Sequence, residues 1–234
     1  MLAQAKQKPN EGAAAAVEDA RLDLITVLQA HHRVLVIMRG PPGSHKSSVA
    51  AHFIETIPNT VSCSADNYFV KPDGEYEWYP KGLGKAHENC RMLCEKHMRD
   101  SKECIIIDNT NIKNKDYDDY LKLAKKHNYF VVQCVPDGRD DSIHEVPKDK
   151  IEQMRTGLEA NDKIPQIKIP DTKPYDKERL KKLAFDAATK DRDILNSLPK
   201  GAATASTAHH RFHPQKRHPR GKGQHQTHFG PKGF

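Results

Sequence analysis

The feature that most constrains the fold is an eight-residue loop, Gly40–Ser47 (GPPGSHKS), which follows a short apolar run at 34–38. A run that is apolar at every position is typical of a parallel strand that is buried on both faces of its sheet. The composition from Ser47 to Ile57 then predicts a helix, which Pro58 ends. A tight loop between a buried strand and a helix points its backbone N–H groups at an anion, so this segment predicts a phosphate-binding loop (P-loop).

The side chains of this loop have separate predicted roles. Lys46 adds a point charge next to the phosphates, and the hydroxyl of Ser47 can hold Mg²⁺. The pattern G-x-x-x-x-G-K-[ST] requires glycine where this chain has His45, and we expect that side chain to strain the loop or to crowd the phosphate rather than to add useful charge. The predicted nucleotide-binding residues are Gly40, Gly43, Ser44, His45, Lys46, Ser47, Ser48 and Thr110.

Beyond the loop, apolar runs alternate with segments of helical composition. Runs at 61–63, 104–108 and 129–135 predict three more strands, and the intervening segments at 85–99 and 117–127 predict helices. Strands that alternate with helices of this length are typical of crossover units, in which helices cover both faces of a parallel sheet. The sequence therefore predicts a three-layer α/β fold.

The chain divides into four segments by composition. We predict a flexible leader at 1–12, a P-loop domain at 13–163 that begins with a helix, a linker and charged helix at 164–200, and a disordered tail at 201–234. The three prolines in 165–175 favour an extended linker, and 175–195 has the composition of a charged helix. Whether 165–200 packs on the domain stays open.

Two aspartates follow predicted strands and are the candidate catalytic acids together with Lys46. Asp66 follows the strand at 61–63 and could be the general base for an attacking hydroxyl, although it could equally cap a helix or a turn. Asp108 ends the strand at 104–108, and a carboxylate beside a P-loop commonly orients Mg²⁺. We therefore predict that Ser47 and Asp108 hold the metal ion.

These motifs resemble the polynucleotide-kinase-like P-loop family, and the kinase-like domain of the Nedd-four-binding-protein-two-like proteins in particular. The resemblance covers about 34–154 and includes four further motifs, which are Ser64–Phe69 (SADNYF), Gly84–Glu88 (GKAHE), Asp108–Asn111 (DNTN) and Ile143–Pro147 (IHEVP). It implies a P-loop NTPase/kinase-like domain that uses ATP and Mg²⁺ and phosphorylates the 5′-hydroxyl ends of DNA or RNA. In that family Asp66 would be the base, and Asp108 and Thr110 would support the metal and phosphate region.

Four departures from the family pattern predict a weakened site. His45 replaces the loop glycine, and Asn67 stands where relatives usually have a second acid. The lid before Ile143 is short, with Asp140 and Asp141 where arginines usually lie, and Gln153 replaces another arginine. Arg139 and Arg155 are the arginines that could substitute, although their register differs from the family's. Lid arginines neutralise the transferring phosphoryl group, so their loss would slow turnover.

The surrounding features leave several alternatives open. Tyr76, Trp78 and Tyr79 could stack on a nucleobase or pack their own loop, while His87 and His144 are more often structural than catalytic. The five cysteines are odd in number and scattered through apolar runs, so they predict reduced thiols and a cytoplasmic or nuclear protein. No apolar run is long enough for a membrane span, and we expect a monomer.

The tail carries most of the excess positive charge. Residues 201–234 hold six Lys or Arg and no Asp or Glu, which leaves +1 of the total net charge of +7 for residues 1–200. A flexible cationic segment attracts nucleic acid without reading its sequence, although a solvated terminus with no partner is the alternative. The candidate nucleic-acid-binding residues of the tail are Arg211, Lys216, Arg217, Arg220 and Lys222.

Two functions therefore remain open at the level of the sequence. The first is an ATP-binding, nucleic-acid-associated protein that is related to 5′-hydroxyl kinases and has a degenerate site. The second is a catalytically inactive pseudokinase that binds nucleic acid or protein.

Overall fold

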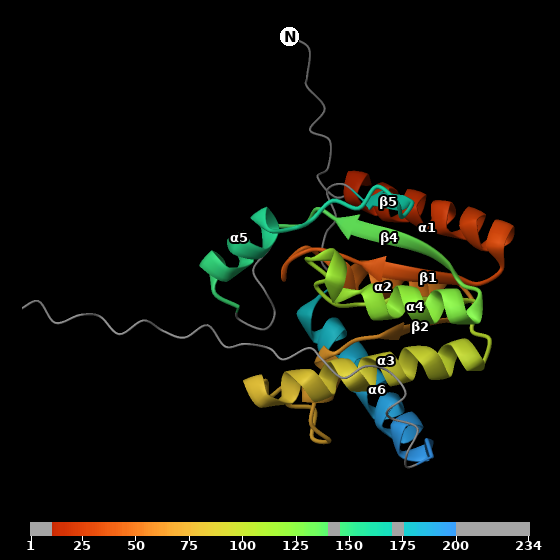
Figure 1. The fold of residues 1–234 in the computed structure, drawn as a ribbon. Coiled ribbons are helices and arrows are strands. Elements are labelled where there is room, and N and C mark those ends of the chain that lie inside the picture. Colours follow the sequence, from red (N-terminus) through yellow and green to blue (C-terminus); the bar gives the residue numbers. More distant parts are fainter. Residues whose placement is uncertain (1–10, 140–145, 170–175, 200–234) are drawn as a thin grey trace, which may run out of the picture. The chain divides into compact units, whose positions relative to one another are not determined.

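The apolar runs form a five-stranded parallel sheet with the strand order β2-β3-β1-β4-β5 (Figure 1). The computed structural model describes residues 11–139, 146–169 and 176–199. β1 lies in the middle of the sheet, and its five residues are all buried. The strands are β1 (Val34–Met38), β2 (Thr60–Cys63), β3 (Cys104–Ile107), β4 (Phe130–Pro136) and β5 (Gln166–Ile169).

Helices cover both faces of the sheet, so the predicted three-layer α/β fold is confirmed. α1 and α2 pack on one face, where Leu24 and Phe53 meet Val36, and α3 and α4 pack on the other, where Leu93 and Tyr120 meet Ile105. Alternate residues of each strand point to opposite faces, so a run that is apolar throughout supplies both layers. The helices are α1 (Glu11–His31), α2 (Lys46–Thr56), α3 (Leu83–Arg99), α4 (Asp118–His127), α5 (Lys148–Thr156) and α6 (Lys177–Ser197).

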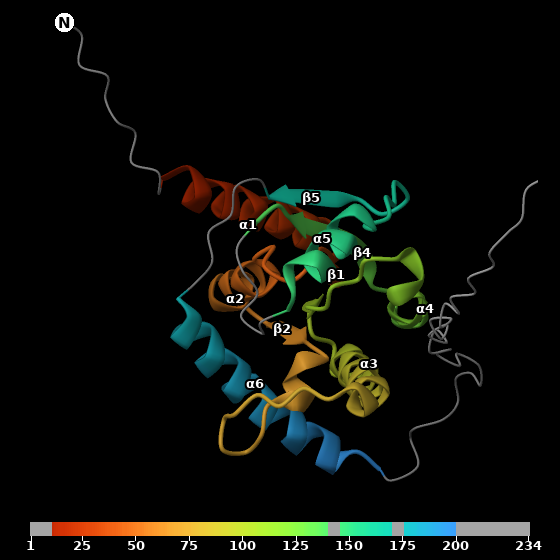
Figure 2. The ribbon, with the colours of Figure 1, turned by 90° about the vertical axis from the view of Figure 1, so that its left-hand side faces the viewer.

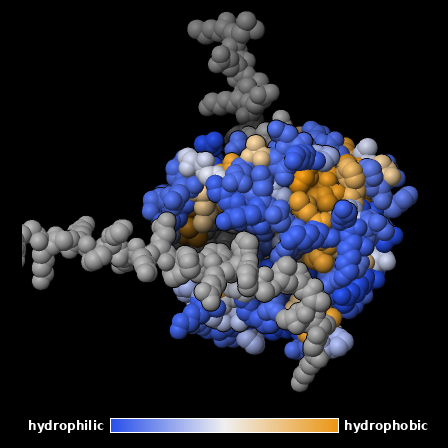
Figure 3. Space-filling model, viewed as in Figure 1, coloured by the Kyte–Doolittle hydropathy of each residue, from blue (hydrophilic) through white to orange (hydrophobic). Residues whose placement is uncertain are grey.

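Three short 3-10 helices complete the described elements. They are η1 (Asp66–Phe69), η2 (Pro80–Gly82) and η3 (Asn114–Asp116). The surface in the view of Figure 3 is mostly hydrophilic, with one larger hydrophobic patch on the right, near β4 and α4. Within the described ranges, no helix combines the length and the apolar character that a membrane crossing requires.

The extended linker predicted at 165–175 is wrong for residues 166–169, and residues 170–175 lie outside the described part of the chain. Gln166–Ile169 forms β5 and pairs with β4, with Cys134 opposite Ile167, and both Ile167 and Ile169 are buried. The preceding Pro165 does not interrupt this pairing, because its carbonyl accepts a hydrogen bond of 2.9 Å from the backbone of Gln133. A four-residue edge strand flanked by prolines has too short an alternating pattern to be distinguished from a linker.

The charged helix predicted at 175–195 is present as α6, and it packs on the domain against α3, α2 and η1. α6 crosses the β2 side of the sheet, as the end-on view in Figure 2 shows. The packed unit therefore continues past the predicted boundary at 163. At its other end α1 begins at Glu11, two residues before the predicted start. The rest of the predicted leader and the tail at 201–234 lie outside the described residues.

Candidate active site

The strand order brings the three sequence-predicted site segments to one edge of the sheet. β3 lies between β1 and β2, with Ile107 opposite both Ile37 and Cys63, so the segments that follow these three strands are neighbours. The P-loop follows β1, Asp108 follows β3, and Asp66 begins η1 shortly after β2. Figure 2 looks onto this carboxyl edge, which is where open parallel α/β sheets bind their ligands.

Two glycines give the P-loop its backbone path. Gly40 and Gly43 have φ values of 137° and 80°, which side chains rarely adopt. A Cβ on Gly40 would lie 2.7 Å from Oγ of Ser44, so this position also has no space for a side chain. The backbone N–H of Gly40 donates to the carbonyl of Thr110 over 2.9 Å, which ties the loop to the segment after β3. The loop is therefore held in shape before any phosphate binds.

Lys46 is buried at the start of α2, and its ammonium folds back over the loop. Its Nζ donates to the carbonyl of Pro41 over 2.8 Å and to Oγ of Ser44 over 3.4 Å. Burial lowers the pKa of Lys46, and the charge of Arg155 acts in the same direction, whereas Asp108 and Asp66 raise it. Lys46 is thus within electrostatic reach of both candidate acids and of an arginine.

Ser47 and Asp108 form the predicted metal-binding pair. A side-chain hydrogen bond links the Ser47 hydroxyl with the Asp108 carboxylate, and burial raises the pKa of Asp108 while Lys46 and this hydrogen bond lower it. A hydroxyl and a carboxylate oxygen are the hard ligands that Mg²⁺ prefers, and nucleotide phosphates usually complete its coordination. No group of three or more His, Cys, Asp or Glu in the described part of the chain is arranged to hold a metal ion. The hydroxyl and carboxylate oxygens of the pair fit Mg²⁺ that is bound together with a nucleotide.

Asp66 lies at the same edge of the sheet, within electrostatic reach of Lys46 and Asp108. Asp66 is the first residue of the short 3-10 turn η1, and the N-cap position of this turn is occupied by Ala65. The Asp66 carboxylate is exposed and accepts a hydrogen bond of 3.4 Å from the hydroxyl of Tyr76. An exposed carboxylate that is within electrostatic reach of Lys46 and Asp108 can take a proton from a hydroxyl that enters from solvent.

His45 adopts the left-handed conformation that the P-loop pattern reserves for glycine. Its φ and ψ are 67° and 20° at the N-cap of α2, which agrees with the expected backbone strain. Its ring packs against Gly138, since a Cβ on Gly138 would lie 2.3 Å from Nδ1 of His45. Because Gly138 has no side chain, the ring of His45 has space beside the loop.

Arg155 of α5 approaches the same place. Its Nη2 donates to the carbonyl of Gly138 over 3.4 Å, and its charge lowers the pKa of Lys46. The other candidate arginine, Arg139, is exposed and lies 3.8 Å from Asp137. His144, Asp140 and Asp141 lie outside the described residues. Of the two arginines named from the sequence, Arg155 is the one that the fold brings to the P-loop.

The C-terminal helix α6 holds the element that carries Asp66, which sequence reasoning missed. Nδ2 of Asn67 donates to Oδ2 of Asp191 over 2.8 Å, and Arg192 donates to the carbonyl of Val70 over 2.8 Å. Burial raises the pKa of Asp191 to about 6. A second acid at position 67 would meet this buried carboxyl group, so the asparagine is explained by the packing of α6. The one sign of this contact in the sequence was Asn67 itself, at a position where the family usually has an acid.

Arg39, directly before the loop, is a second residue that the sequence analysis did not single out. It is only 2 % exposed, and its guanidinium donates to the carbonyls of Asn111, Ile112 and Glu159 and to the side chain of Gln133. Asn111 in turn donates from its side chain to the carbonyl of Met38 over 2.7 Å. This network fixes the base of the P-loop. The signal in the sequence that could have revealed it was a charged residue directly after a buried strand.

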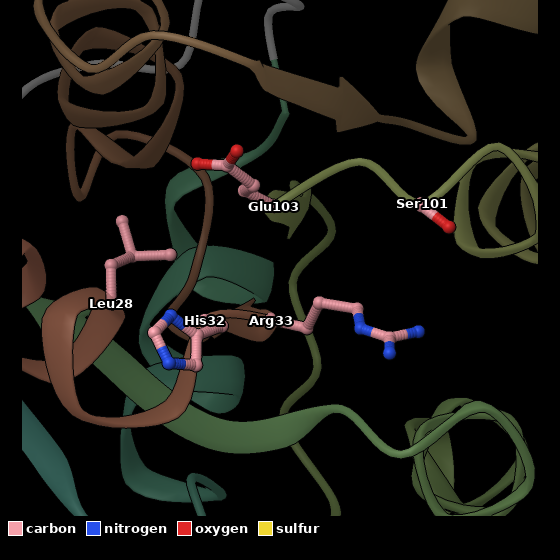
Figure 4. Close-up of a pocket in the computed structure, with 5 residues that line it drawn as sticks. All are labelled: Leu28, His32, Arg33, Ser101 and Glu103. Carbon is pink, nitrogen blue, oxygen red and sulfur yellow. The ribbon is translucent and has the colours of Figure 1, made fainter.

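A pocket of about 330 Å³ lies at the other edge of the sheet (Figure 4). Its lining includes Arg33 and Glu103, which directly precede β1 and β3. These residues lie at the amino ends of strands, away from the P-loop. The pocket is therefore separate from the site described above.

Comparison with known proteins identifies the domain. Residues 35–145 match the family model described as "AAA domain", a stretch that runs from β1 through the P-loop and past β4. The fold of this region is an α/β P-loop kinase-like fold. The resemblance inferred from the motifs is confirmed by human NEDD4-binding protein 2, which is 32 % identical over 198 residues that cover 78 % of this chain.

Two other proteins are similar to parts of this chain. Rat 2′,3′-cyclic-nucleotide 3′-phosphodiesterase is 26 % identical over 58 % of this chain. A chain in the structure of the Pnkp1/Rnl/Hen1 complex is 20 % identical, with a TM-score of 0.40, over 57 % of this chain and 45 % of its own length. The aligned stretches cover 11 % of NEDD4-binding protein 2 and 34 % of the phosphodiesterase, so this chain spans only a minor part of the length of each.

Proposed function

We propose that this domain binds ATP with Mg²⁺ and transfers the γ-phosphoryl group to the 5′-hydroxyl of a nucleic acid. The observation that supports this most strongly is the convergence of a buried Lys46, the hydrogen-bonded Ser47–Asp108 pair and an exposed Asp66 at one edge of the sheet. Phosphoryl transfer requires a phosphate cradle, a metal site, a base for the attacking hydroxyl and positive charge near the transferred group.

Each residue has a role that follows from its position. Lys46 would exchange its hydrogen bonds with Pro41 and Ser44 for phosphate oxygens, and Ser47 with Asp108 would hold the metal ion that Mg·ATP supplies. Asp66 would take the proton from the attacking hydroxyl as that oxygen bonds to phosphorus and the bond to the leaving diphosphate breaks. Arg155 would offset the negative charge that develops on the transferred group.

The departures from the family pattern have counterparts in the packing, which favours a working site over a lost one. The ring of His45 lies against Gly138, Asn67 is paired with Asp191, and Arg155 lies near Lys46. The nucleic acid acceptor is supported by the motif resemblance and by the basic composition of 201–234. A monomer in the cytoplasm or nucleus, without a membrane partner, stays a prediction from the sequence.

The second candidate is a pseudokinase that keeps the fold as a binding module. The left-handed conformation of His45 favours it, because strain at the phosphate cradle would oppose tight nucleotide binding. In this case the tail, with Arg211, Lys216, Arg217, Arg220 and Lys222, would supply the affinity for nucleic acid.

Nucleotide binding distinguishes the two candidates. We would titrate the full chain with Mg·ATP by calorimetry beside Lys46→Ala, with the exposed Lys125→Ala as a matched control. Saturable binding that only Lys46→Ala abolishes supports the kinase, and transfer of label from ATP to a 5′-hydroxyl oligonucleotide, lost in Asp66→Asn, would establish it. Absence of binding at millimolar ATP would favour the pseudokinase.

A further inference from the structure

Exposed aromatic side chains gather in the segment that follows Asp66. Of the five large hydrophobic residues that are exposed in the described part of the chain, three lie between positions 68 and 79, while Leu22 and Ile54 lie apart on α1 and α2. The three are Tyr68, Trp78 and Tyr79, with 37 %, 51 % and 43 % of their surface exposed. We call these three residues the aromatic platform.

The platform has a fixed structure although it is exposed. The buried ring of Phe69 contacts all three residues, with centroid distances of 5.3 Å to Tyr68, 5.5 Å to Tyr79 and 6.3 Å to Trp78. Gly82 leaves room for the ring of Tyr79, since a Cβ there would lie 2.6 Å from Cε2 of the tyrosine. Rings that are already held in place lose little conformational entropy when a flat ligand binds to them.

The same segment leads directly to the candidate base. Tyr76 packs 6.1 Å from Phe69 and donates its hydroxyl to the Asp66 carboxylate over 3.4 Å. The chain folds back on itself here, because Val70 and Tyr76 form an antiparallel bridge and the backbone of Glu77 donates to the carbonyl of Phe69. A ligand on the platform would therefore lie next to the carboxylate that receives the acceptor hydroxyl.

We propose that the aromatic platform stacks on the unpaired bases at the 5′ end of a single-stranded acceptor, which makes this a binding site for nucleobases. The inference rests on the proposed function, because it places the acceptor strand at Asp66. Every nucleobase has a π-face, so stacking on tyrosine and tryptophan binds single strands without reading their sequence. A base-paired end would first have to unstack, so we expect single-stranded ends to bind more tightly than blunt duplexes.

The platform carries its own probe, because Trp78 is the single tryptophan of the whole chain. We would titrate the full-length protein without ATP, following tryptophan fluorescence, with a 5′-hydroxyl single-stranded oligonucleotide and with the same strand made abasic at its first two nucleotides. We expect saturable quenching by the intact strand and a Kd about 5-fold to 100-fold higher for the abasic one. Equal affinity for the two strands would overturn the proposal.

Variants test the individual rings by anisotropy of a labelled strand. Trp78→Leu and Tyr79→Leu should each weaken binding about 5-fold or more, and Trp78→Phe should restore much of the loss because it keeps a ring. Leu22→Ala, at an equally exposed position on α1, is the control and should bind like the parent. If emission instead changes with protein concentration alone and sedimentation shows dimers, the platform is an interface between copies and the proposal is wrong.

The failure of this proposal can be distinguished from the failure of the proposed function. Base-dependent quenching without any phosphate transfer would keep the platform and remove the kinase activity. Equal phosphorylation of intact and abasic strands would keep the activity and remove the platform.

Discussion

Gly138 and His45 occupy complementary space: a Cβ on Gly138 would lie 2.3 Å from Nδ1 and 2.5 Å from Cγ of the His45 ring. Gly138 follows β4 and His45 is the N-cap of α2, so the contact joins two neighbouring segments at the carboxyl edge of the sheet. The histidine that breaks the P-loop pattern thus has a glycine that accommodates it. The effect of a substitution at either position depends on the other.

A double-mutant cycle tests this dependence. Gly138→Ala alone should destabilise the fold by about 1–3 kcal/mol, because the added methyl group overlaps a ring that packs beside backbone. The same substitution in a His45→Gly background should cost much less, since the ring is gone. The measurement is the free energy of unfolding in urea for the four proteins. Additive effects would show that the two residues do not interact in solution.

The His45→Gly variant by itself reports on the strained loop. Glycine adopts φ near 67° without the cost of about 1–2 kcal/mol that other residues incur in the left-handed region. We expect ATP to bind at least several-fold more tightly, as measured by calorimetry with Mg·ATP. An unchanged Kd would mean that the parent loop already binds phosphate without strain, or that another residue limits binding.

Arg155 is the arginine that we expect to act on the transferred phosphoryl group. Arg155→Ala should lower kcat by about 10²-fold or more, because a charged donor near the phosphates is worth several kcal/mol in the transition state. Arg155→Lys should recover only part of this loss, since lysine cannot form a bidentate contact. The measurement is the steady-state rate of phosphate transfer to a 5′-hydroxyl oligonucleotide.

Arg139 provides the matched control for this prediction. It is exposed on the segment between β4 and α5, and its contact in the structure is the 3.8 Å ion pair with Asp137. Arg139→Ala should leave kcat within about 2-fold of the parent, as expected for an exposed ion pair. A larger loss for Arg139→Ala than for Arg155→Ala would reverse the assignment.

The buried carboxyl group of Asp191 should make the free energy of unfolding depend on pH. Because burial raises the pKa of Asp191 from 3.8 to about 6, the folded state binds this proton more tightly than the unfolded state. Ionising the buried carboxyl group therefore costs nothing at pH values below the unfolded-state pKa of 3.8, and it has its full cost above the folded-state pKa of about 6. The free energy of unfolding decreases as the pH rises between these two pKa values. Asp191→Asn should be more stable than the parent by roughly 1–3 kcal/mol at pH 7.5, and the difference should fall to roughly a third of that at pH 4.5.

Urea unfolding at these two pH values measures the effect. Asp193→Asn is the control, because Asp193 is exposed on the same helix and its replacement should change stability by a small amount that is similar at both pH values. If the gain from Asp191→Asn is the same at pH 4.5 and pH 7.5, the carboxyl group does not titrate in this window.

We expect the basic tail at 201–234 to add to the affinity for nucleic acid in a way that decreases with salt concentration. Deleting 201–234 removes six Lys or Arg, so the slope of log K against log salt should become shallower by up to about 4 for single strands. The platform predicts that the truncated protein still prefers intact over abasic strands. An unchanged slope would exclude the tail as a source of affinity.

The sequence by itself determined the elements whose pattern is local. The run at 34–38, the P-loop after it and the acid after 104–107 were all predicted, because a buried strand and the turn that follows it are encoded by adjacent residues. Strand ends of a parallel sheet share an edge, so the grouping of Lys46, Ser47 and Asp108 also followed from the order of motifs.

Tertiary structure alone decided the features that join distant segments. β5 has four residues and becomes a strand through its pairing with β4, and Asn67 differs from the family pattern because Asp191, 124 residues away, packs against it. The place of the His45 ring likewise depends on the absence of a side chain at Gly138. Each of these contacts depends on the shape and charge of a residue that is far away in the sequence, and local propensity carries no information about that partner.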